Sequence, residues 1–471
     1  MITAILLCTP LVMAAITFLL RNDKLAKILL VGGAAVHTVC TVHLWDNPDI
    51  LKLGSSLLLY ADTDGYLVLA VTAVLFLLCS IYLCFWLPMD SEQSGAECSM
   101  KQYTLAALLH IFLFTMTLAS VAQDFGMLWV AVEATTLSSA PLINYHRGKG
   151  SLEAMWKYLL ICSIGIGLAL FGTMFIAASQ SDPHGSLGFA ALQRALVTGS
   201  VQMIWFKMGF VLCFAGYALK MGIAPFHTWL PDAYSEAPSP ISALLSGSLI
   251  NYALLAIVRL LGVIPESLQD FSGDYLKFFG FFSLAVAAFF IVRQKDFKRM
   301  LAYSSVEHMG VIMIMLAYDL RYVAIFHMVS HSLIKMTLFL VAGNILLAYR
   351  NRAISGVHGL FKKIPVNAAL WIVGMLLICG TPPSPLFFTE LQLVRAAGFI
   401  PGAVILVLLL IIFAGMSQAV LKMCAPAEGV SNTLEVDKKV EKLAFIPVIS
   451  AAIITFSGVY ALILAWILKG L

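Results

Sequence analysis

Fourteen apolar segments follow one another along this chain, and each is long enough to cross a lipid bilayer. A spanning helix needs about 17–25 predominantly apolar residues, and a window of about 19 residues finds such segments. They lie at residues 3–20, 26–44, 65–88, 103–122, 126–144, 156–179, 203–230, 240–264, 275–293, 300–318, 321–348, 365–393, 402–424 and 443–469. Only 11% of the residues are charged, against roughly a quarter in soluble domains. The sequence predicts an all-α integral membrane protein with about 14 transmembrane helices.

The positive charges are distributed unevenly between the loops. Of 29 Lys and Arg residues, 18 lie in odd-numbered loops, six in even-numbered loops or the C-terminal tail, and five within segments. Because loops rich in Lys and Arg face the cytoplasm, we expect both termini outside. The first segment has neither a basic stretch before it nor a small-residue cleavage site, so we expect a retained helix rather than a signal peptide.

Two of the segments are interrupted by glycine and proline. The seventh contains "GIAPFHTWLP" and the twelfth "GTPPSPLFF", and the residues expected to break the helices are Gly222, Pro225, Pro382, Pro383 and Pro385. Irregular backbone at membrane depth is tolerated only where it is buried in protein or lines a wet cavity. A corresponding pair of interrupted segments points to repeated halves and an ion pathway.

The interrupted segments lie five segments apart, which predicts two inverted five-helix repeats, helices 4–8 and helices 9–13. Helices 1–3 then occupy residues 1–100, and the first repeat occupies residues 101–265. The second, inverted repeat occupies residues 266–425, and a loop and helix 14 occupy residues 426–471. No soluble domain is expected.

Ionisable side chains at a helix centre cost roughly 2.5–3.5 kcal/mol each, so those present need a reason. The candidates for proton translocation are Glu133, Lys220, His327, His331, Lys335 and Glu390. His327, His331 and Lys335 are spaced four apart, so a helix places them in one polar stripe that rises about 12 Å. Further candidates are Lys157, His227, Asp232, Glu307 and His308.

Proton relay is the chemistry that such groups support. Burial disfavours the charged form of a lysine and a nearby carboxylate favours it. Opening or closing a Glu133–Lys220 pair would therefore release or capture a proton. Histidine, with an ordinary pKa of about 6.5, can pass protons in either direction.

Structural roles are the alternatives for several of these residues. Glu133 and His308 could each be hydrogen-bonding residues between helices. Lys157 could extend from a helix end to the membrane surface. His227 and Asp232 could cap the second half of helix 7 or hold its turn. Three aligned ionisable groups, as in the stripe, are harder to explain by packing.

Motifs for covalent or metal chemistry are missing from the sequence. The nine cysteines are scattered, without a C-x-x-C or Cys/His cluster, so no iron–sulfur or zinc site is expected. There is no nucleotide-binding loop, GxSxG or HExxH. We expect neither catalytic residues nor a metal or cofactor in this chain.

Several stretches resemble the antiporter-like subunits of respiratory complex I and its relatives, over roughly residues 100–395. They are "KMGIAPFHTWLPDAYSEAPSP", "DFKRMLAYSS" and "FHMVSHSLIKMTLFLVAGN". Three others, "WVAVEATTLSSAPL", "SLEAMWKYLLIC" and "LAYSSVEHMG", are most similar to the F-type subunit of hydrogenase-4. That subunit belongs to the membrane arm of group 4 nickel–iron hydrogenases such as formate hydrogenlyase.

The resemblance implies a fourteen-helix fold with two inverted repeats and assigns residues to the family's positions. Glu133 matches the helix 5 glutamate, Lys220 the helix 7 lysine, and Lys335 the central lysine with His327 and His331 beside it. Glu390 matches the residue after the second break, and Lys157 a lysine of the first half-channel. Asn251 is a departure, because many relatives have a titratable lysine or histidine there. Asparagine cannot titrate, although it can orient water.

The resemblance implies a proton-translocating subunit of a membrane-bound, hydrogenase-type respiratory complex in the cytoplasmic (inner) membrane of a prokaryote. The nickel–iron site and iron–sulfur clusters are expected in soluble partner subunits. Further antiporter-like and proximal-type membrane subunits of the same complex are expected as neighbours. No nucleic-acid partner is expected.

Three other functions stay open. The chain could belong to a multisubunit sodium/proton antiporter, and dependence of transport on sodium would distinguish this function from that of a hydrogenase-type subunit. It could be the membrane subunit of an inorganic-carbon uptake system with a soluble zinc partner, which neighbouring genes would reveal. It could also be a structural anchor that conducts no ions.

Overall fold

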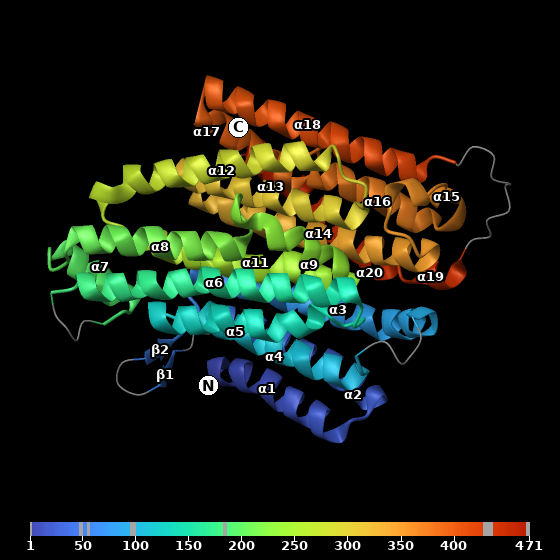
Figure 1. Cartoon of the computed structure of the whole chain (residues 1–471), viewed down its shortest axis with the longest axis horizontal. Coiled ribbons are helices and arrows are strands. Elements are labelled where there is room, and N and C mark those ends of the chain that lie inside the picture. Colours follow the sequence, from blue (N-terminus) through green and yellow to red (C-terminus); the bar gives the residue numbers. More distant parts are fainter. Residues whose placement is uncertain are drawn as a thin grey trace. The chain divides into compact units, whose positions relative to one another are not determined.

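The structure, a computed structural model, describes residues 2–46, 50–53, 57–94, 100–181, 186–426 and 437–467. Within these ranges, thirteen helices are long and apolar enough to cross a membrane. The remaining predicted span, residues 365–393, is divided into two shorter helices, Pro365–Ile378 and Pro385–Ala397. The predicted all-α membrane fold is confirmed (Figure 1). Residues 468–469 of the last predicted span and residues 427–436 of the loop before it lie outside the described ranges.

The elements have the following bounds. Up to the first break they are α1 (Ile2–Leu20), α2 (Asp23–Asp46), β1 (Leu51–Leu53), β2 (Leu57–Leu59), α3 (Thr63–Ser94), α4 (Gln102–Val121), α5 (Phe125–Ile143), α6 (Lys149–Ser179), α7 (Phe189–Val197) and α8 (Met203–Met221). After it they are α9 (Trp229–Glu236), α10 (Ser239–Leu244), α11 (Ile250–Gly262), α12 (Gln269–Ile291), α13 (Phe297–Ala317), α14 (Arg321–Tyr349), α15 (Leu360–Lys363), α16 (Pro365–Ile378), α17 (Pro385–Ala397), α18 (Phe399–Cys424), α19 (Lys438–Lys442) and α20 (Phe445–Ile467).

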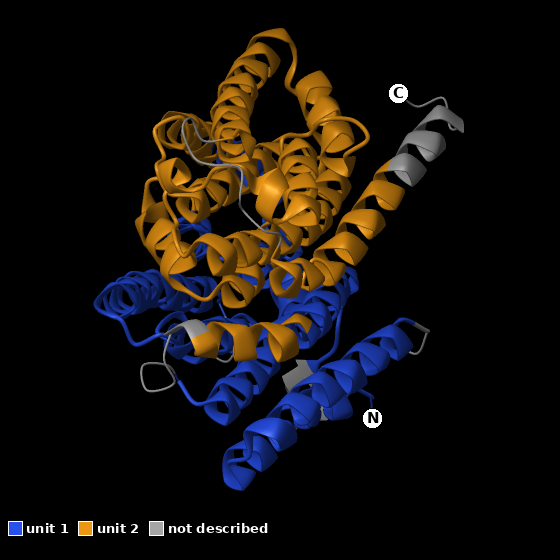
Figure 2. Ribbon diagram, turned by 90° about the vertical axis from the view of Figure 1, so that its right-hand side faces the viewer, with its two compact units in different colours: residues 1–81, 98–222, 248–274 blue, residues 82–97, 223–247, 275–471 orange. Residues whose placement is uncertain are grey.

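The chain forms two compact units, coloured separately in Figure 2. The first unit contains residues 1–81, 98–222 and 248–274, and the second contains residues 82–97, 223–247 and 275–471. These boundaries follow spatial contacts, whereas the predicted boundaries followed the succession of helices. The four predicted regions of the chain stay a prediction.

Helices α6 and α8 pack closely in the first unit and lie side by side in Figure 1. Glycine makes this approach possible, because a Cβ on Gly172 would lie only 2.5 Å from the backbone nitrogen of Cys213. Small residues at such crossings allow two helix backbones to come close together. The contact brings side chains of α6 against the last turn of α8, where Lys220 lies.

Helix α14 is the centre of the second unit. Helices α10, α13, α16, α17 and α20 all pack against it, and most of its side chains between Ala324 and Leu347 are buried. The polar residues of α14 therefore face other helices rather than lipid.

The first predicted break is confirmed between α8 and α9. Gly222 adopts a left-handed conformation, with φ of 80°, and ends α8. Glycine is favoured there because a side chain disfavours positive φ. The backbone N–H of Ala224 donates to the hydroxyl of Ser283 at 2.9 Å, so a backbone group released by the break finds a partner.

The second predicted break is confirmed between α16 and α17. Ser384 bridges it, because its hydroxyl donates to the carbonyl oxygen of Leu377 at 2.7 Å and accepts from the N–H of Leu386 at 3.2 Å. Both breaks contain a cis proline peptide bond, Ala224–Pro225 and Pro382–Pro383. Each half of the chain thus holds one interrupted helix.

Three local features differ from the expected elements. Strands β1 and β2 form a short antiparallel hairpin that pairs Leu51 with Leu59, and α7 lies in a stretch predicted as loop. Strands of three residues and a helix of nine are too short for a spanning-length window to detect. Residues Leu245–Leu249, between α10 and α11, form a π-helical turn. Such turns have no clear signature in hydrophobic periodicity.

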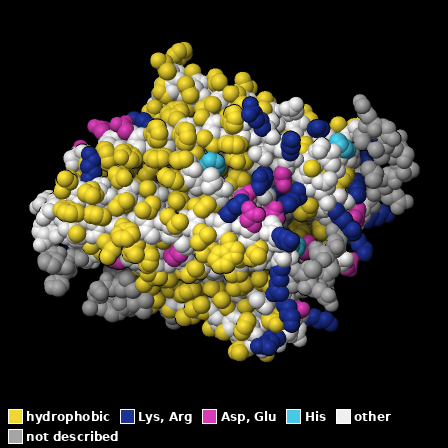
Figure 3. Space-filling model, in the orientation of Figure 1, with side chains coloured by type: hydrophobic (Ala, Val, Ile, Leu, Met, Phe, Trp, Pro, Cys, Tyr) yellow, Lys and Arg dark blue, Asp and Glu magenta, His cyan; other side chains and the backbone are white. Residues whose placement is uncertain are grey.

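Hydrophobic side chains cover much of the visible surface, and Lys and Arg side chains gather toward one end of the helices (Figure 3). On α6, for example, Leu160, Ile164 and Phe171 are each more than half exposed. Large apolar side chains at lipid-facing positions are expected in a membrane protein, because the bilayer replaces water as their surroundings.

Candidate functional site

Lys220 is completely buried in the last turn of α8. Its Nζ donates to the hydroxyl of Thr136 on α5 at 2.5 Å and to the hydroxyl of Tyr158 on α6 at 3.0 Å. Three helices of the first unit therefore meet at this ammonium group. A buried lysine needs such acceptors, because an unpaired charge inside a membrane protein is costly.

Glu133 is linked to Lys220 through Thr136. The Thr136 hydroxyl accepts from Lys220 and donates to Oε2 of Glu133 at 3.2 Å, and the hydroxyl of Ser163 donates to Oε1 at 2.7 Å. The predicted pair is thus brought together, but with one hydroxyl between the two charged groups. Thr136 follows Glu133 by three residues, a spacing that places both on one face of a helix.

A second branch leads from Lys220 through Tyr158. The hydroxyls of Tyr158 and Ser139 lie 2.7 Å apart, and Ser139 donates to the carbonyl oxygen of Thr135 at 2.6 Å. Ser139 has one hydroxyl hydrogen, so it accepts from Tyr158. Glu133, Thr136, Lys220, Tyr158 and Ser139 form one chain of hydrogen bonds, which we name the Lys220 chain.

Lys335 is a completely buried lysine on α14 of the second unit. Its Nζ donates to the carbonyl oxygen of Leu301 and to the hydroxyl of Ser304, both on α13 and both at 2.5 Å. Glu307 lies three residues after Ser304 and is also buried. It lies close enough to Lys335 for their charges to interact.

Three buried histidines lie between α13 and α14. The Nδ1 atom of His308 is 3.0 Å from Nε2 of His327, and Nδ1 of His327 is 2.8 Å from the hydroxyl of Thr389 on α17. The ring centre of His331 lies 5.1 Å from that of His308. The predicted stripe of α14 therefore faces α13, and His308 becomes a member of the same histidine cluster.

Glu390 lies beside the second break. Its carboxylate contacts the position that a Cβ on Gly380 would occupy, so glycine leaves room for this side chain. The residue is 9% exposed, and its Oε1 atom has no hydrogen-bond partner among the described residues. A buried carboxyl oxygen of this kind is suited to hold a water molecule or a proton.

Two of the further candidates are placed at surfaces. Lys157 forms an ion pair with Glu153 one turn earlier, at 2.6 Å, and 47% of its side chain is exposed. Asp232 forms an ion pair with Arg299 in the second unit. These contacts are compatible with the structural alternatives for both residues, and their role in translocation stays a prediction.

His227 and Asn251 lie deeper. The ring centre of His227 is 5.9 Å from that of Tyr303 in the turn after the first break. Asn251 is completely buried at the start of α11, directly after the π-helical turn. Their part in translocation stays a prediction.

Sequence analysis missed the hydroxyl groups that join these residues. Thr136, Tyr158, Ser304 and Thr389 each lie within hydrogen-bond distance of a predicted site residue, and Ser139 is bound to Tyr158. Only Thr136 had a usable signal, its three-residue spacing from Glu133. Within the described residues, no group of three or more His, Cys, Asp or Glu side chains is arranged to hold a metal ion.

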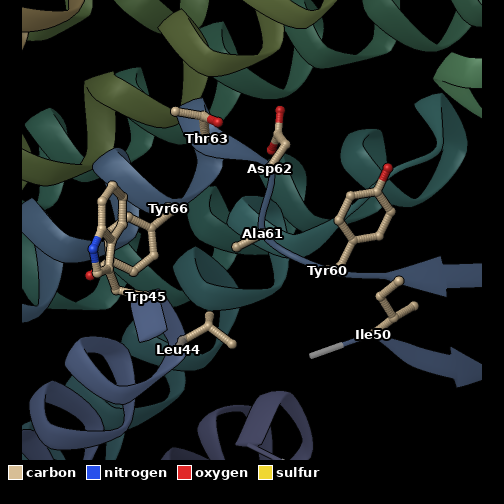
Figure 4. A pocket seen from close by; sticks show the side chains of 8 residues that line it. All are labelled: Leu44, Trp45, Ile50, Tyr60, Ala61, Asp62, Thr63 and Tyr66. Atoms are coloured by element: carbon tan, nitrogen blue, oxygen red, sulfur yellow. The ribbon is translucent and has the colours of Figure 1, made fainter. Parts of the chain in front are cut away.

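A cavity of about 300 Å³ lies in the first unit where α2 ends and α3 begins (Figure 4). It is lined by Leu44, Trp45, Ile50, Tyr60, Ala61, Asp62, Thr63 and Tyr66. Asp62 pairs with buried Arg259 at 2.6 Å. None of the predicted translocation residues lines this cavity.

Comparison with known proteins identifies the family of the chain. Residues 122–417, more than half of the chain, match the family described as "NADH:quinone oxidoreductase/Mrp antiporter, TM". The chain belongs to this family. The resemblance to antiporter-like subunits of complex I and its relatives is therefore confirmed.

A curated relative and two solved structures illustrate the similarity. The hydrogenase-4 component F homolog of Methylacidiphilum infernorum is 36% identical over 299 residues, which cover 62% of this chain and 62% of that relative. A chain of the membrane-bound sulfane sulfur reductase, an archaeal respiratory membrane complex, superposes with a TM-score of 0.85 at 24% identity, covering 98% of this chain and 94% of the other. A chain of the Mrp complex from a Dietzia species gives 0.81 at 20% identity, covering 98% and 95%. The structural likenesses show the antiporter-like fold.

Proposed function

We propose that this antiporter-like subunit translocates protons within a membrane-bound, hydrogenase-type respiratory complex. The observation that supports this most is that each unit contains a completely buried lysine on a central helix, Lys220 in the first and Lys335 in the second, bound to hydroxyl and carbonyl acceptors. A lysine can release a proton and take it up again when its surroundings change. Glu133, Glu307 and the histidines provide groups nearby that can exchange it.

The hydrogenase-type assignment is supported by the similarity to the hydrogenase-4 component F homolog. In this proposal the redox chemistry belongs to other subunits of the complex, which hold a nickel–iron site and iron–sulfur clusters, as in formate hydrogenlyase. Moving one charge against 100 mV requires about 2.3 kcal/mol. The partners must therefore supply energy, and this chain moves the ions.

The uneven distribution of Lys and Arg supports an orientation with both termini outside the cytoplasmic (inner) membrane. The same proposal places the complex in the membrane of a prokaryotic cell. Labelling of single cysteines at the two sides of the membrane would test the orientation.

Transport by the purified intact complex, reconstituted into vesicles, tests the function. Turnover of the redox partners should acidify or alkalise the vesicle interior, and Lys220→Ala and Lys335→Ala should each abolish the pH change. Lys207→Ala is the matched control, because Lys207 lies on the same helix as Lys220 but at the surface, over the ring of Phe271. Full pumping by an assembled Lys220→Ala complex would contradict the proposal.

A sodium/proton antiporter subunit is the second candidate, and the likeness to the Mrp complex supports it. The two proposed functions differ in the ion that is transported. If transport requires sodium and proceeds without redox turnover, the sodium/proton antiporter function is the correct one and the hydrogenase-type function is wrong.

A further inference from the structure

The hydroxyl of Thr389 lies between a backbone carbonyl oxygen and a ring nitrogen of the histidine cluster. Its Oγ1 atom donates to the carbonyl oxygen of Leu386 at 2.8 Å. A threonine hydroxyl has one hydrogen, and a carbonyl oxygen can only accept it. While its hydrogen is donated to Leu386, the hydroxyl can only accept toward Nδ1 of His327, which lies 2.8 Å away. In this arrangement His327 bears its hydrogen on Nδ1.

The same reasoning passes from His327 to His308. A neutral imidazole has one N–H and one bare nitrogen, so Nε2 of neutral His327 is bare. It lies 3.0 Å from Nδ1 of His308, which must donate to it. His308 then has a bare Nε2 atom, and this atom has no partner among the described residues.

We propose that Thr389 fixes the tautomers of both histidines and closes one end of a proton relay. A proton binds to Nε2 of His308, and the proton on Nδ1 of His308 moves to Nε2 of His327. Binding of the proton places one positive charge on His308, and the transfer moves this charge to His327. Further transfer from Nδ1 of His327 is blocked, because the only hydrogen of Thr389 is held by the carbonyl of Leu386.

The groups around the pair are consistent with an entry at His308. The His331 ring lies beside His308 at 5.1 Å between ring centres, and Lys335 and the backbone carbonyl of Ile378 are near enough to interact electrostatically with His308. Glu307 is near enough to interact with Lys335. At the closed end, Thr389 directly precedes Glu390 on α17. Rotation of the Thr389 hydroxyl away from Leu386 would open this end.

An independent threonine–histidine pair in the first unit provides an internal comparison. Thr117 donates to the carbonyl oxygen of Leu113 at 2.8 Å, and Nε2 of His37 lies 2.9 Å from the Thr117 hydroxyl. While Thr117 donates to Leu113, His37 bears its hydrogen on Nε2, and its Nδ1 atom has no partner among the described residues. The two threonines thus select opposite tautomers for His37 and His327.

Nitrogen-15 NMR of histidine-labelled complex in membranes tests the proposal, because protonated and bare ring nitrogens give separate signals. Difference spectra against His327→Asn and His37→Asn assign the two rings. The wild-type complex should show His327 protonated on Nδ1 and His37 on Nε2. Thr389→Val removes the acceptor and should shift His327 toward the Nε2–H form without changing His37. Thr389→Ser should retain the wild-type signal, and Thr117→Val should change only His37.

The assignment is overturned if wild-type His327 is protonated on Nε2, or if Thr389→Val leaves its signal unchanged. The wild-type spectrum tests the tautomer of His327 even if the Thr389→Val variant does not assemble. The relay itself rests on the proposed function and has a separate readout: Thr389→Val should lose coupled proton movement that Thr389→Ser retains. Correct tautomers in a complex that moves no protons would contradict the proposed function but not the role of Thr389 in fixing the rings.

Discussion

Lys220 and Glu133 are joined by a single hydroxyl group. The Nζ of Lys220 donates to Thr136, and Thr136 donates to the Glu133 carboxylate. A proton lost by Lys220 can pass to this hydroxyl while the hydroxyl's own hydrogen passes to Glu133. The two charged residues can therefore exchange a proton without touching each other.

Replacing Thr136 by valine should interrupt this exchange. Valine keeps the shape but removes the hydroxyl, and loss of a hydrogen bond to a charged group costs about 1.5–3 kcal/mol, roughly tenfold or more in an equilibrium constant. We expect proton movement in vesicles to fall by about that factor. Thr136→Ser, which keeps the hydroxyl, should retain most of it, and equal activity of the two variants would contradict the linking role of Thr136.

Tyr158 provides the second acceptor for Lys220, so Tyr158→Phe should also reduce proton movement. The effect should be smaller than that of Lys220→Ala, because Thr136 still accepts from the ammonium group. Tyr322→Phe is the matched control, since Tyr322 is 89% exposed. The measurement is the pH change in vesicles per redox turnover, and similar values for both tyrosine variants would exclude a role for Tyr158.

In the second unit, Ser304→Ala should weaken proton movement less than Lys335→Ala. The alanine variant removes one acceptor of Lys335, but the carbonyl oxygen of Leu301 remains. Ser272→Ala serves as control, because the hydroxyl of this buried serine donates to the carbonyl oxygen of Gln269 on its own helix. An effect of Ser304→Ala as large as that of Lys335→Ala would mean that the serine acts beyond holding the lysine.

Stability should depend on Arg259 much more than on Arg299. Arg259 is buried and donates to Asp62 and to the carbonyl oxygens of Ala119 and Ser120, and each hydrogen bond of a charged group contributes about 1.5–3 kcal/mol. The side chain of Arg299 is 45% exposed, and exposed pairs contribute about 0–1 kcal/mol. Thermal unfolding of the detergent-solubilised complex should show a large decrease for Arg259→Ala and a small one for Arg299→Ala. The reverse order would disprove this ranking.

Gly222→Ala should destabilise the end of α8. Its φ of 80° costs an alanine about 1–2 kcal/mol. Gly262→Ala is the control, because Gly262 lies at the end of α11 with no atom near its Cβ position and no positive φ. Thermal unfolding should distinguish the two, and proton movement should fall only in the first variant if the break positions Lys220.

Much of the fold was predictable from particular stretches of sequence. The lengths of the apolar segments predicted the spanning helices, because every backbone group must be satisfied inside the bilayer. "GIAPFHTWLP" and "GTPPSPLFF" predicted the two breaks, because glycine and proline interrupt helical hydrogen bonding. The hairpin β1–β2 and the short helix α7 were not predicted, since neither is long enough to show a period of its own.

The candidate site also contains some residues that the sequence predicted and others that it did not. Glu133, Lys220, the stripe of α14 and Glu390 stand out in the sequence because charge is costly in a membrane, and the four-residue spacing places the stripe on one face. The sequence by itself determined these residues and the helices that hold them. Only the tertiary structure decided that Thr136 joins Lys220 to Glu133 and that Thr389 ends the histidine pair. Hydroxyl side chains are common in membrane helices and cost little there, so their function depends on partners from other helices, which sequence spacing does not reveal.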